Sequence, residues 1–301
     1  MSVLPGSANT VQSITYPVNY AILAPMKYID THAHLNLSQF DTDRAEVFAA
    51  CAEASVGVIN IGTRRETSAL AVELANQHPN AWAMVGVHPC SVIDVDPDDH
   101  AAREAEPVFD YDFYKQLALD PKTVGIGECG FDYCHNAEDT FELQREVFLD
   151  QIELANEVGK PLMLHLRNDP RGGQRCAYND ALDILRTESK VLGNAHFYAG
   201  TIAQAKAFFD IGFTISFTGV VTFKATKPGI QDYLDVVKYA PLDMIHAETD
   251  CPYIAPVPHR GKRCEPWMVQ EVYKSIAEVK GEDQEKVREQ LLTNAKRLYQ
   301  L

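Results

Sequence analysis

The sequence predicts a single α/β domain, built as a closed (β/α)8 barrel, and three observations support this fold class. First, short β-rich segments alternate with helix-like segments, which is the pattern of parallel βαβ units. Second, eight such β-rich segments follow one another along the chain, a number that favours a closed barrel. Third, the length of 301 residues accommodates one barrel of about 250 residues.

The predicted strands are short apolar runs, and helix-like segments separate them. Residues 139–160 are apolar at every third or fourth position and end near Gly159, as an amphipathic helix with a glycine stop does. Residues 227–240 show the same pattern. An open doubly wound sheet is the alternative, but no G-x-G-x-x-G motif follows the first strand. The eight predicted strands are residues 27–32, 56–62, 82–88, 123–128, 161–166, 193–197, 213–218 and 244–249.

The chain contains no internal repeat, low-complexity tract or linker that would divide it. We therefore expect one barrel domain over residues 26–301. Residues 1–25 precede the first βα unit and are predicted to form an N-terminal extension. The alternative is an ordered strand that covers the floor of the barrel.

Composition and charge limit the classes of protein that fit the sequence. Hydrophobic residues make up 46% and charged residues 23%, as in a globular protein with a large core. No apolar run is long enough to span a membrane, no secretory signal is visible, and the seven cysteines contain no C-x-x-C pair, so we expect a cytoplasmic protein without a membrane partner. The net charge of −15 argues against tight coating of nucleic acid. It leaves a nucleic-acid substrate open, because a cleft that holds cations is locally positive.

Polar side chains gather at the carboxyl ends of the predicted strands, where barrel enzymes keep their catalytic groups. The first strand ends in His32 and His34, which project from the same face of an extended chain. Buried ionisable groups are costly unless they are paired or bind a metal. The predicted strand ends carry six such groups, which are too many ligands for one four- or five-coordinate metal. Six ligands suit two metals that share a carboxylate. The other four, on the fourth, fifth, sixth and eighth strands, are Glu128, His165, His196 and Asp250.

With these residues the chain resembles the TatD-type metal-dependent deoxyribonucleases of the amidohydrolase superfamily. The resemblance covers residues 27 to about 300, and the last of its motifs is long and specific. It implies a TIM-type barrel that hydrolyses phosphodiester bonds in DNA, commonly from an end. The motifs are "DTHAHL" (30–35), "GVHP" (86–89), "GECGFDY" (127–133), "KPLMLHLR" (160–167), "FTGVVTF" (217–223) and "ETDCPYIAPVPHRGKRCEP" (248–266).

The resemblance also implies a division of the ligands between two divalent cations. His32, His34 and Asp250 would hold the first cation. His165 and His196 would hold the second, and Glu128 would bridge the two. Mixed imidazole and carboxylate ligands suit zinc, manganese or cobalt, whereas magnesium prefers oxygen ligands, so the sequence leaves the choice among Mg, Mn and Zn open.

The expected chemistry follows from such a pair of cations. A shared water would become acidic enough to supply hydroxide near neutral pH, and Asp250 is the candidate to accept its proton. Glu128 would take part by holding both cations.

Several further residues are candidates for contact with the substrate. The basic run 259–263 follows the eighth strand, and its alternative is a solvated surface run. Arg167 should face the same way as His165, and His88 should line the pocket without binding metal. Glu248 is expected to orient its neighbours. The phosphate-contact candidates are His259, Arg260, Lys262, Arg263 and Arg167.

Two departures from the family pattern bear on specificity and packing. Residues 197–200 read Phe-Tyr-Ala-Gly where relatives commonly carry Cys-Phe-Ser-Gly, which affects substrate preference. His246 takes a usually aliphatic position and is expected to be a buried histidine bonded to Glu248, the alternative being a specialised subfamily. Cys129 and Cys251 adjoin proposed ligands and should pack outward under helices.

Three functions remain open at the level of sequence. The leading hypothesis is a two-metal phosphodiesterase that acts as an exonuclease on single-stranded DNA ends. The second is a metal-dependent ester or amide hydrolase, such as one acting on aminoacyl-tRNA. The third is a non-catalytic barrel that binds a partner. The basic run favours phosphate, and the six intact ligands argue against a vestigial site. The oligomeric state stays open and a monomer is compatible with the sequence.

Overall fold

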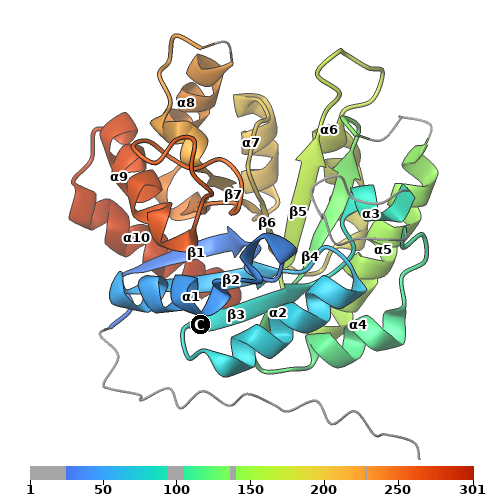
Figure 1. Cartoon of the computed structure of the whole chain (residues 1–301). Helices are drawn as coiled ribbons and strands as arrows, with labels where there is room; N and C mark the ends of the chain where they lie inside the picture. The colour runs from blue at the N-terminus through green and yellow to red at the C-terminus, as the bar shows by residue number, and fades with distance from the viewer. Residues whose placement is uncertain (1–24, 94–104, 136–139, 228) are drawn as a thin grey trace, which may run out of the picture.

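The computed structural model describes residues 25–93, 105–135, 140–227 and 229–301. Eight parallel strands pair in chain order from β1 to β8 and form a nearly closed barrel, which confirms the predicted fold class (Figure 1). The predicted N-terminal extension lies outside the described residues except for residue 25. Within the described residues, no helix is both long and apolar enough to cross a membrane.

The strands occupy the predicted segments with small shifts at their ends. β4 continues to Asp132, four residues past its predicted end at 128, and its pairing with β5 shifts register between Ile126 and Cys129. β6 and β8 are shorter than predicted, so His196 and Asp250 lie just beyond their strands. The strands are β1 (Tyr28–Ala33), β2 (Val56–Ile61), β3 (Ala81–Val85), β4 (Thr123–Asp132), β5 (Leu162–Arg167), β6 (Gly193–Ala195), β7 (Thr214–Phe217) and β8 (Ile245–Ala247).

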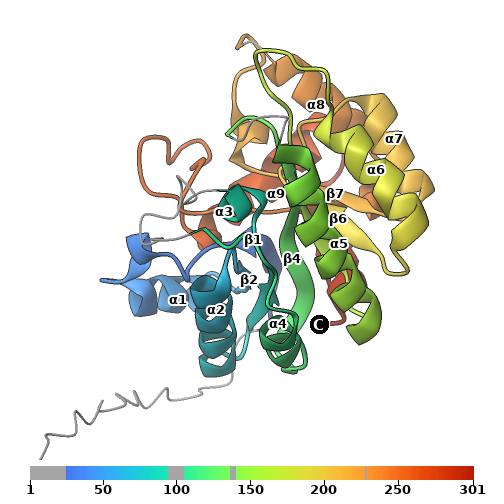
Figure 2. The ribbon, with the colours of Figure 1, turned by 90° about the vertical axis from the view of Figure 1, so that its right-hand side faces the viewer.

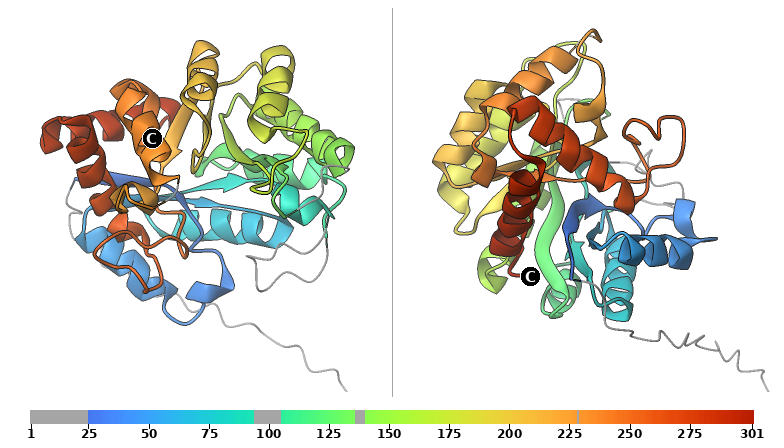
Figure 3. Two further views of the ribbon diagram at one scale, coloured as in Figure 1. Left: turned by 90° about the horizontal axis from the view of Figure 1, so that it is seen from above. Right: turned by 90° about the vertical axis from the view of Figure 1, so that its left-hand side faces the viewer.

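The helices surround the strands, as the view from above shows (Figure 3). Short 3-10 helices lie at Ser38–Phe40, Gly219–Thr222, Leu242–Met244 and Pro266–Met268. The α-helices are α1 (Arg44–Glu53), α2 (Arg65–Gln77), α3 (Pro89–Ile93), α4 (Tyr111–Ala118), α5 (Phe141–Val158), α6 (Ala177–Glu188), α7 (Ile202–Asp210), α8 (Ile230–Tyr239), α9 (Val269–Lys280) and α10 (Gln284–Tyr299).

Helix α5 illustrates how the sequence sets the outer layer. It ends at Gly159, whose φ of 66° is left-handed, and a glycine adopts this conformation without the steric cost of a side chain. Figure 2 shows α5, α6 and α7 side by side along the outside of the barrel. The predicted helices at 139–160 and 227–240 are therefore confirmed as α5 and α8.

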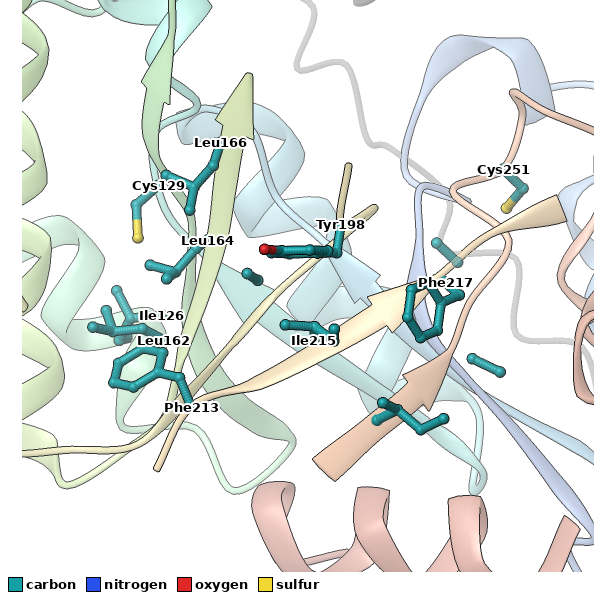
Figure 4. Close-up of a cluster of buried hydrophobic side chains, with 14 of the residues drawn as sticks. Ile126, Cys129, Leu162, Leu164, Leu166, Tyr198, Phe213, Ile215, Phe217 and Cys251 are labelled. Carbon is teal, nitrogen blue, oxygen red and sulfur yellow. The ribbon is translucent and has the colours of Figure 1, made fainter. Parts of the chain in front are cut away.

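Outward-facing strand residues form the main hydrophobic core under these helices. Ile126, Leu162 and Phe213 belong to this core and are fully or almost fully buried (Figure 4). Cys129 and Cys251 belong to the same core, as predicted from the alternation of strand side chains. Close packing of such side chains is the main stabilising contribution to a barrel of this size.

A smaller apolar cluster fills the floor of the barrel. Ile59, Met84 and Met163 point inward from three strands and pack with Leu298 and Tyr299 of α10. The C-terminal helix therefore covers the floor.

The barrel closes where β8 returns beside β1. Ala33 and Cys251 form a parallel bridge, and the backbone N–H of Asp250 donates to the carbonyl of His32 at 3.0 Å. The fully buried Asp30 accepts from the backbone N–H of Thr249 at 2.9 Å and from its hydroxyl at 2.5 Å. Burial raises the pKa of Asp30 well above its usual range, against the effect of these hydrogen bonds. This seam places the residues after β8 next to the end of β1.

His246 lies in the barrel interior above the floor and is 1% exposed. Its Nε2 atom lies 3.0 Å from the hydroxyl of Thr214, so Thr214 is the partner in place of the expected Glu248. Residues 246 and 248 are separated by roughly 6.6 Å along one strand, whereas β7 lies directly alongside. Burial, with a smaller effect of Arg297, lowers the pKa of His246 to about 3.

Replacement of His246 by leucine should reduce the acid sensitivity of folding. The unfolded histidine binds a proton below a pH of 6.5, whereas the folded one does so only near 3, so its contribution to stability is lost as pH falls between these values. One such proton changes the free energy of unfolding by at most about 1.4 kcal/mol per pH unit. Urea unfolding at pH 7 and pH 4.5 should therefore show a smaller loss of stability for His246→Leu than for the parent protein. Equal losses would contradict this role.

Candidate metal centre

A cavity of about 610 Å³ opens at the carboxyl ends of the strands, and this volume is typical of small-ligand sites. His32 is fully buried beside it. The other predicted ligands line it, namely His34, Glu128, His165, His196 and Asp250. The barrel therefore brings the six predicted residues together.

Glu128 lies between two pairs of imidazoles. Its Oε2 atom lies 3.4 Å from Nε2 of His32 and 3.7 Å from Nε2 of His34. Its Oε1 atom lies 2.6 Å from Nε2 of His196 and 2.8 Å from Nδ1 of His165. The two carboxylate oxygens thus face different histidines, and Oε1 also has Nε2 of His88 at 3.5 Å.

Asp250 completes the group around His32 and His34. Its Oδ1 atom lies 3.5 Å from Nε2 of His34 and 3.8 Å from Nε2 of His32, and the two Nε2 atoms are 3.1 Å apart. Metal–ligand bonds of 2.0–2.2 Å in a tetrahedral site place ligand atoms roughly 3.4 Å apart. The spacing of these donor atoms therefore fits a divalent cation.

Hydrogen bonds on the outer side of the rings orient the inner nitrogens. Nδ1 of His34 lies 3.0 Å from the carbonyl of Ile61, which only accepts, so the proton is on Nδ1 and Nε2 keeps its lone pair. Nε2 of His165 lies 3.0 Å from Oδ2 of Asp132, which leaves Nδ1 to face Glu128. Outer partners of this kind fix metal-binding histidines in the required tautomer.

The charges of the buried groups compensate one another. Burial alone would raise the pKa of Glu128, but the imidazoles around it, those of His196 and His32 above all, hold it well below its usual range. Burial also opposes the charged form of His165, yet Asp132 and Glu128 raise its pKa to about 9. Burial and the neighbouring His196 lower the pKa of His32 to about 3. The site thus offers both carboxylate oxygens and imidazole nitrogens, a combination that suits zinc or manganese.

His88 lines the cavity in an orientation that differs from that of the candidate ligands. Its Nδ1 atom accepts the backbone N–H of Cys90 at 3.1 Å, so the proton is on Nε2. That N–H is directed toward Oε1 of Glu128, 3.5 Å away. His88 lines the cavity as predicted, and its donor atom lies within 4.8 Å of those of Glu128 and His165, so the expectation that it does not bind metal stays a prediction.

Glu248 holds the segment that follows β6. Its Oε1 atom accepts the backbone N–H of Phe197 at 2.6 Å and lies 3.6 Å from Nδ1 of His196. Its Oε2 atom accepts the hydroxyl of Ser216 at 2.6 Å. These contacts agree with an orienting role for Glu248.

Sequence reasoning missed Asp132, which is fully buried at the end of β4. Its Oδ1 atom accepts the backbone N–H groups of Cys134 and His135, each at 2.8 Å, while Oδ2 contacts His165. Burial would raise the pKa of Asp132, but His165 and the backbone donors hold it well below its usual range. The signal was its position: residues 128 and 132 share a strand face.

The basic run 259–263 lies outside the cavity lining. Arg263 pairs with Asp43 at 2.6 Å and with Glu265 at 3.0 Å, so we leave it out of the proposed phosphate contacts. Arg260 is exposed, donates to the carbonyl of Ala255 at 2.9 Å and stacks over Phe223.

The other two candidates of the basic run, His259 and Lys262, differ in their contacts. The ring of His259 lies 5.0 Å from that of Trp267, edge to face, and Lys262 is exposed. Arg167 is exposed at the end of β5 and lines the cavity. Among the described residues, its guanidinium has no ion-pair partner.

Comparison with known proteins shows which family the chain belongs to. Residues 29–300 match the family described as TatD related DNase. The chain belongs to this family. It is accordingly a metal-dependent hydrolase, as its curated relatives are named.

Two relatives illustrate the range of the family. The uncharacterized metal-dependent hydrolase YabD of Bacillus subtilis is 38% identical, over 90% of this chain and 98% of its own. A protein of Rahnella named 3'-5' ssDNA/RNA exonuclease TatD is 30% identical, over 89% of this chain and 96% of its own.

Solved structures share the fold. YjjV of Escherichia coli, a TatD homologue, superposes with a TM-score of 0.77 at 23% identity, over 92% of this chain and 99% of its own. A TatD-family hydrolase of Entamoeba histolytica gives a TM-score of 0.73 at 18% identity, over 91% of this chain and 98% of its own.

Replacement of Asp132 by asparagine should lower the affinity for the cation that His165 binds. If the amide presents its N–H group to Nε2 of His165, the ring must carry its proton on Nδ1, where the metal would bind. We expect that affinity to fall about 10- to 100-fold, measured by metal titration of the chelator-treated protein. Asp183→Asn, on the exposed surface of α6, is the control. Unchanged affinity in Asp132→Asn would show that Asp132 does not orient the ligand.

Proposed function

We propose that the protein hydrolyses phosphodiester bonds in single-stranded DNA, acting from an end, with two divalent cations. The observation that carries this proposal is the position of Glu128, whose two oxygens face two separate pairs of histidines.

The family resemblance suggests a division of the ligands, and the grouping of His32, His34 and Asp250 supports its first part. His32, His34 and Asp250 would hold one cation, His165 and His196 the other, and Glu128 both. Once bound, the cations would acidify a water and stabilise the charge that develops on the phosphate. The two cations would be Mg, Mn or Zn.

The protein's own groups account for proton transfer and positioning. Asp250 is partly exposed to the cavity, so its carboxylate would be available to accept the proton of the attacking water. His88 directs its Nε2–H group toward Glu128 and limits the free volume at this side. Glu248 keeps Phe197 in place through a hydrogen bond from its backbone N–H, and its carboxylate lies 3.6 Å from Nδ1 of His196.

The remaining cavity wall suits a nucleotide at a strand end. Arg167 offers a phosphate group a guanidinium that has no ion-pair partner in the described part of the chain. Phe197 and Tyr253 are partly exposed and provide aromatic surface, and bases stack on such side chains without sequence preference. The name of the Rahnella relative agrees with this class of substrate. An ester or amide substrate would not need Arg167.

The protein should lose hydrolysis when its metals are removed and regain it when they return. We expect the chelator-treated protein, reloaded with Mg, Mn or Zn, to release mononucleotides from end-labelled single-stranded DNA. Single-stranded RNA and an aminoacyl ester are compared in parallel. Faster turnover of the ester than of either nucleic acid would refute the proposed substrate class.

The same assay tests Asp250. Asp250→Ala should reduce kcat about 100-fold or more, because it removes both a metal ligand and the proton acceptor. Asp243→Ala, at the opposite end of β8, should retain the parental rate. Parental turnover in Asp250→Ala would exclude the assigned role.

Arg167→Ala should raise KM for single-stranded DNA and reduce the salt dependence of binding. Loss of one phosphate contact lowers the slope of log Kd against log salt by about 0.7 for single strands. Arg260→Ala should act in the same direction by less, because its guanidinium is held against Phe223 outside the cavity. Arg186→Ala, on the surface of α6, is the control. An unaltered slope in Arg167→Ala would remove it from the substrate contacts.

A further inference from the structure

A second cluster of metal-ligand side chains lies beside the candidate metal centre. It consists of Cys90 in α3, Asp132 at the end of β4 and His135 in the turn that follows, and we call it the Cys90 cluster. Nδ1 of His135 lies 3.0 Å from Oδ2 of Asp132 and 3.7 Å from Sγ of Cys90. One ligand atom from each residue lies within 4.8 Å of the other two.

These distances fit a thiolate, an imidazole and a carboxylate on one cation. Zinc binds cysteine sulfur at 2.3 Å and histidine nitrogen at 2.0–2.1 Å, which in a tetrahedral site separates sulfur and nitrogen by roughly 3.5 Å. The observed 3.7 Å between Cys90 and His135 requires little movement. A cysteine ligand favours zinc over magnesium or calcium, which prefer oxygen.

The backbone around the cluster holds its donor atoms in place. The N–H groups of Cys134 and His135 fix Oδ1 of Asp132, so that Oδ2 faces the other two ligands. The backbone N–H of Cys90 donates to His88, which fixes the start of α3. Oδ2 of Asp132 lies 3.0 Å from Nε2 of His165 and 3.0 Å from Nδ1 of His135, so a cation bound by the cluster would replace the proton between Oδ2 and His135.

The cluster is also accessible. Cys90 and Asp132 are buried, whereas His135 is exposed and lines the cavity. A cation can therefore enter past His135. Three protein ligands leave one position of a tetrahedral shell open, as in sites where zinc contacts water or a substrate.

We propose that Cys90, Asp132 and His135 form a further cation site, selective for zinc or another thiophilic divalent metal. The site is distinct from the candidate metal centre, whose six residues include no sulfur ligand. The two are linked because Asp132 also contacts His165. Occupancy of the Cys90 cluster therefore changes the charge next to that histidine.

Cobalt(II) tests this proposal independently of catalysis. The chelator-treated full-length protein is titrated with cobalt(II) under a phosphine reductant. A thiolate-to-cobalt charge-transfer band in the near ultraviolet is expected, and the candidate metal centre cannot produce it because it lacks cysteine. Elemental analysis should count one more tightly bound cobalt per chain in the parent protein than in Cys90→Ser.

Variants assign the band to the cluster. Cys90→Ser should abolish it and remove one bound cobalt, whereas Cys134→Ser, a neighbouring and partly exposed cysteine, should retain both. His135→Gln changes an exposed residue, so folding is not at risk. Titration followed by the charge-transfer band should show that this variant binds cobalt at the Cys90 cluster at least tenfold more weakly. The proposal is overturned if the parent protein shows no band, if the band survives Cys90→Ser, or if His135→Gln binds cobalt with unchanged affinity. Because hydrolysis is not the readout, these outcomes are independent of the proposed phosphodiesterase activity.

Discussion

The return of β8 to β1 is the constraint on which the rest of the site depends. Asp30 and Thr249 are 219 positions apart in the chain, yet the buried carboxyl group of one accepts both the N–H and the hydroxyl of the other. This contact lies where few backbone pairs join the two segments, since Ala33 and Cys251 form an isolated parallel bridge. It places Asp250 next to His32, and without it the first group of candidate ligands would not exist. An unpaired buried carboxyl group would be costly, so the seam is also stabilised by satisfying Asp30.

The barrel interior changes character from floor to mouth. At the floor, Met84 and Met163 pack against Leu298 of α10 in an apolar cluster. Above it, hydrogen bonds connect Asn194 to Ser216 and Ser216 to Glu248. The candidate ligands come last, where the cavity begins. This gradient lets one domain combine a stabilising core with ionisable groups that would be unfavourable inside it, because the ionisable groups lie at the mouth, away from the apolar floor.

The sequence predicted much of this site because strand geometry is regular. His32 and His34, like His165 and Arg167, share a strand face at a spacing of two residues, and the structure keeps both pairs together. The same rule would have found Asp132, four residues after Glu128, but the predicted strand ended too early. The partners of Arg263 and His246 were not predictable from spacing. Asp43 pairs with Arg263 because the loop after β8 folds back on the start of α1. Thr214 contacts His246 because β7 lies beside β8.

By itself the sequence determined the eightfold alternation of strands and helices, the membership of the candidate ligand set, and the outward packing of Cys129 and Cys251. These depend on periodicity and on residue type, which are local properties of the chain. Only the tertiary structure decided how Glu128 divides its two oxygens between histidine pairs, which ring nitrogens carry protons, and that Cys90 lies beside His135. Those features depend on distances between segments far apart in sequence, which are fixed when the barrel closes and its side chains pack.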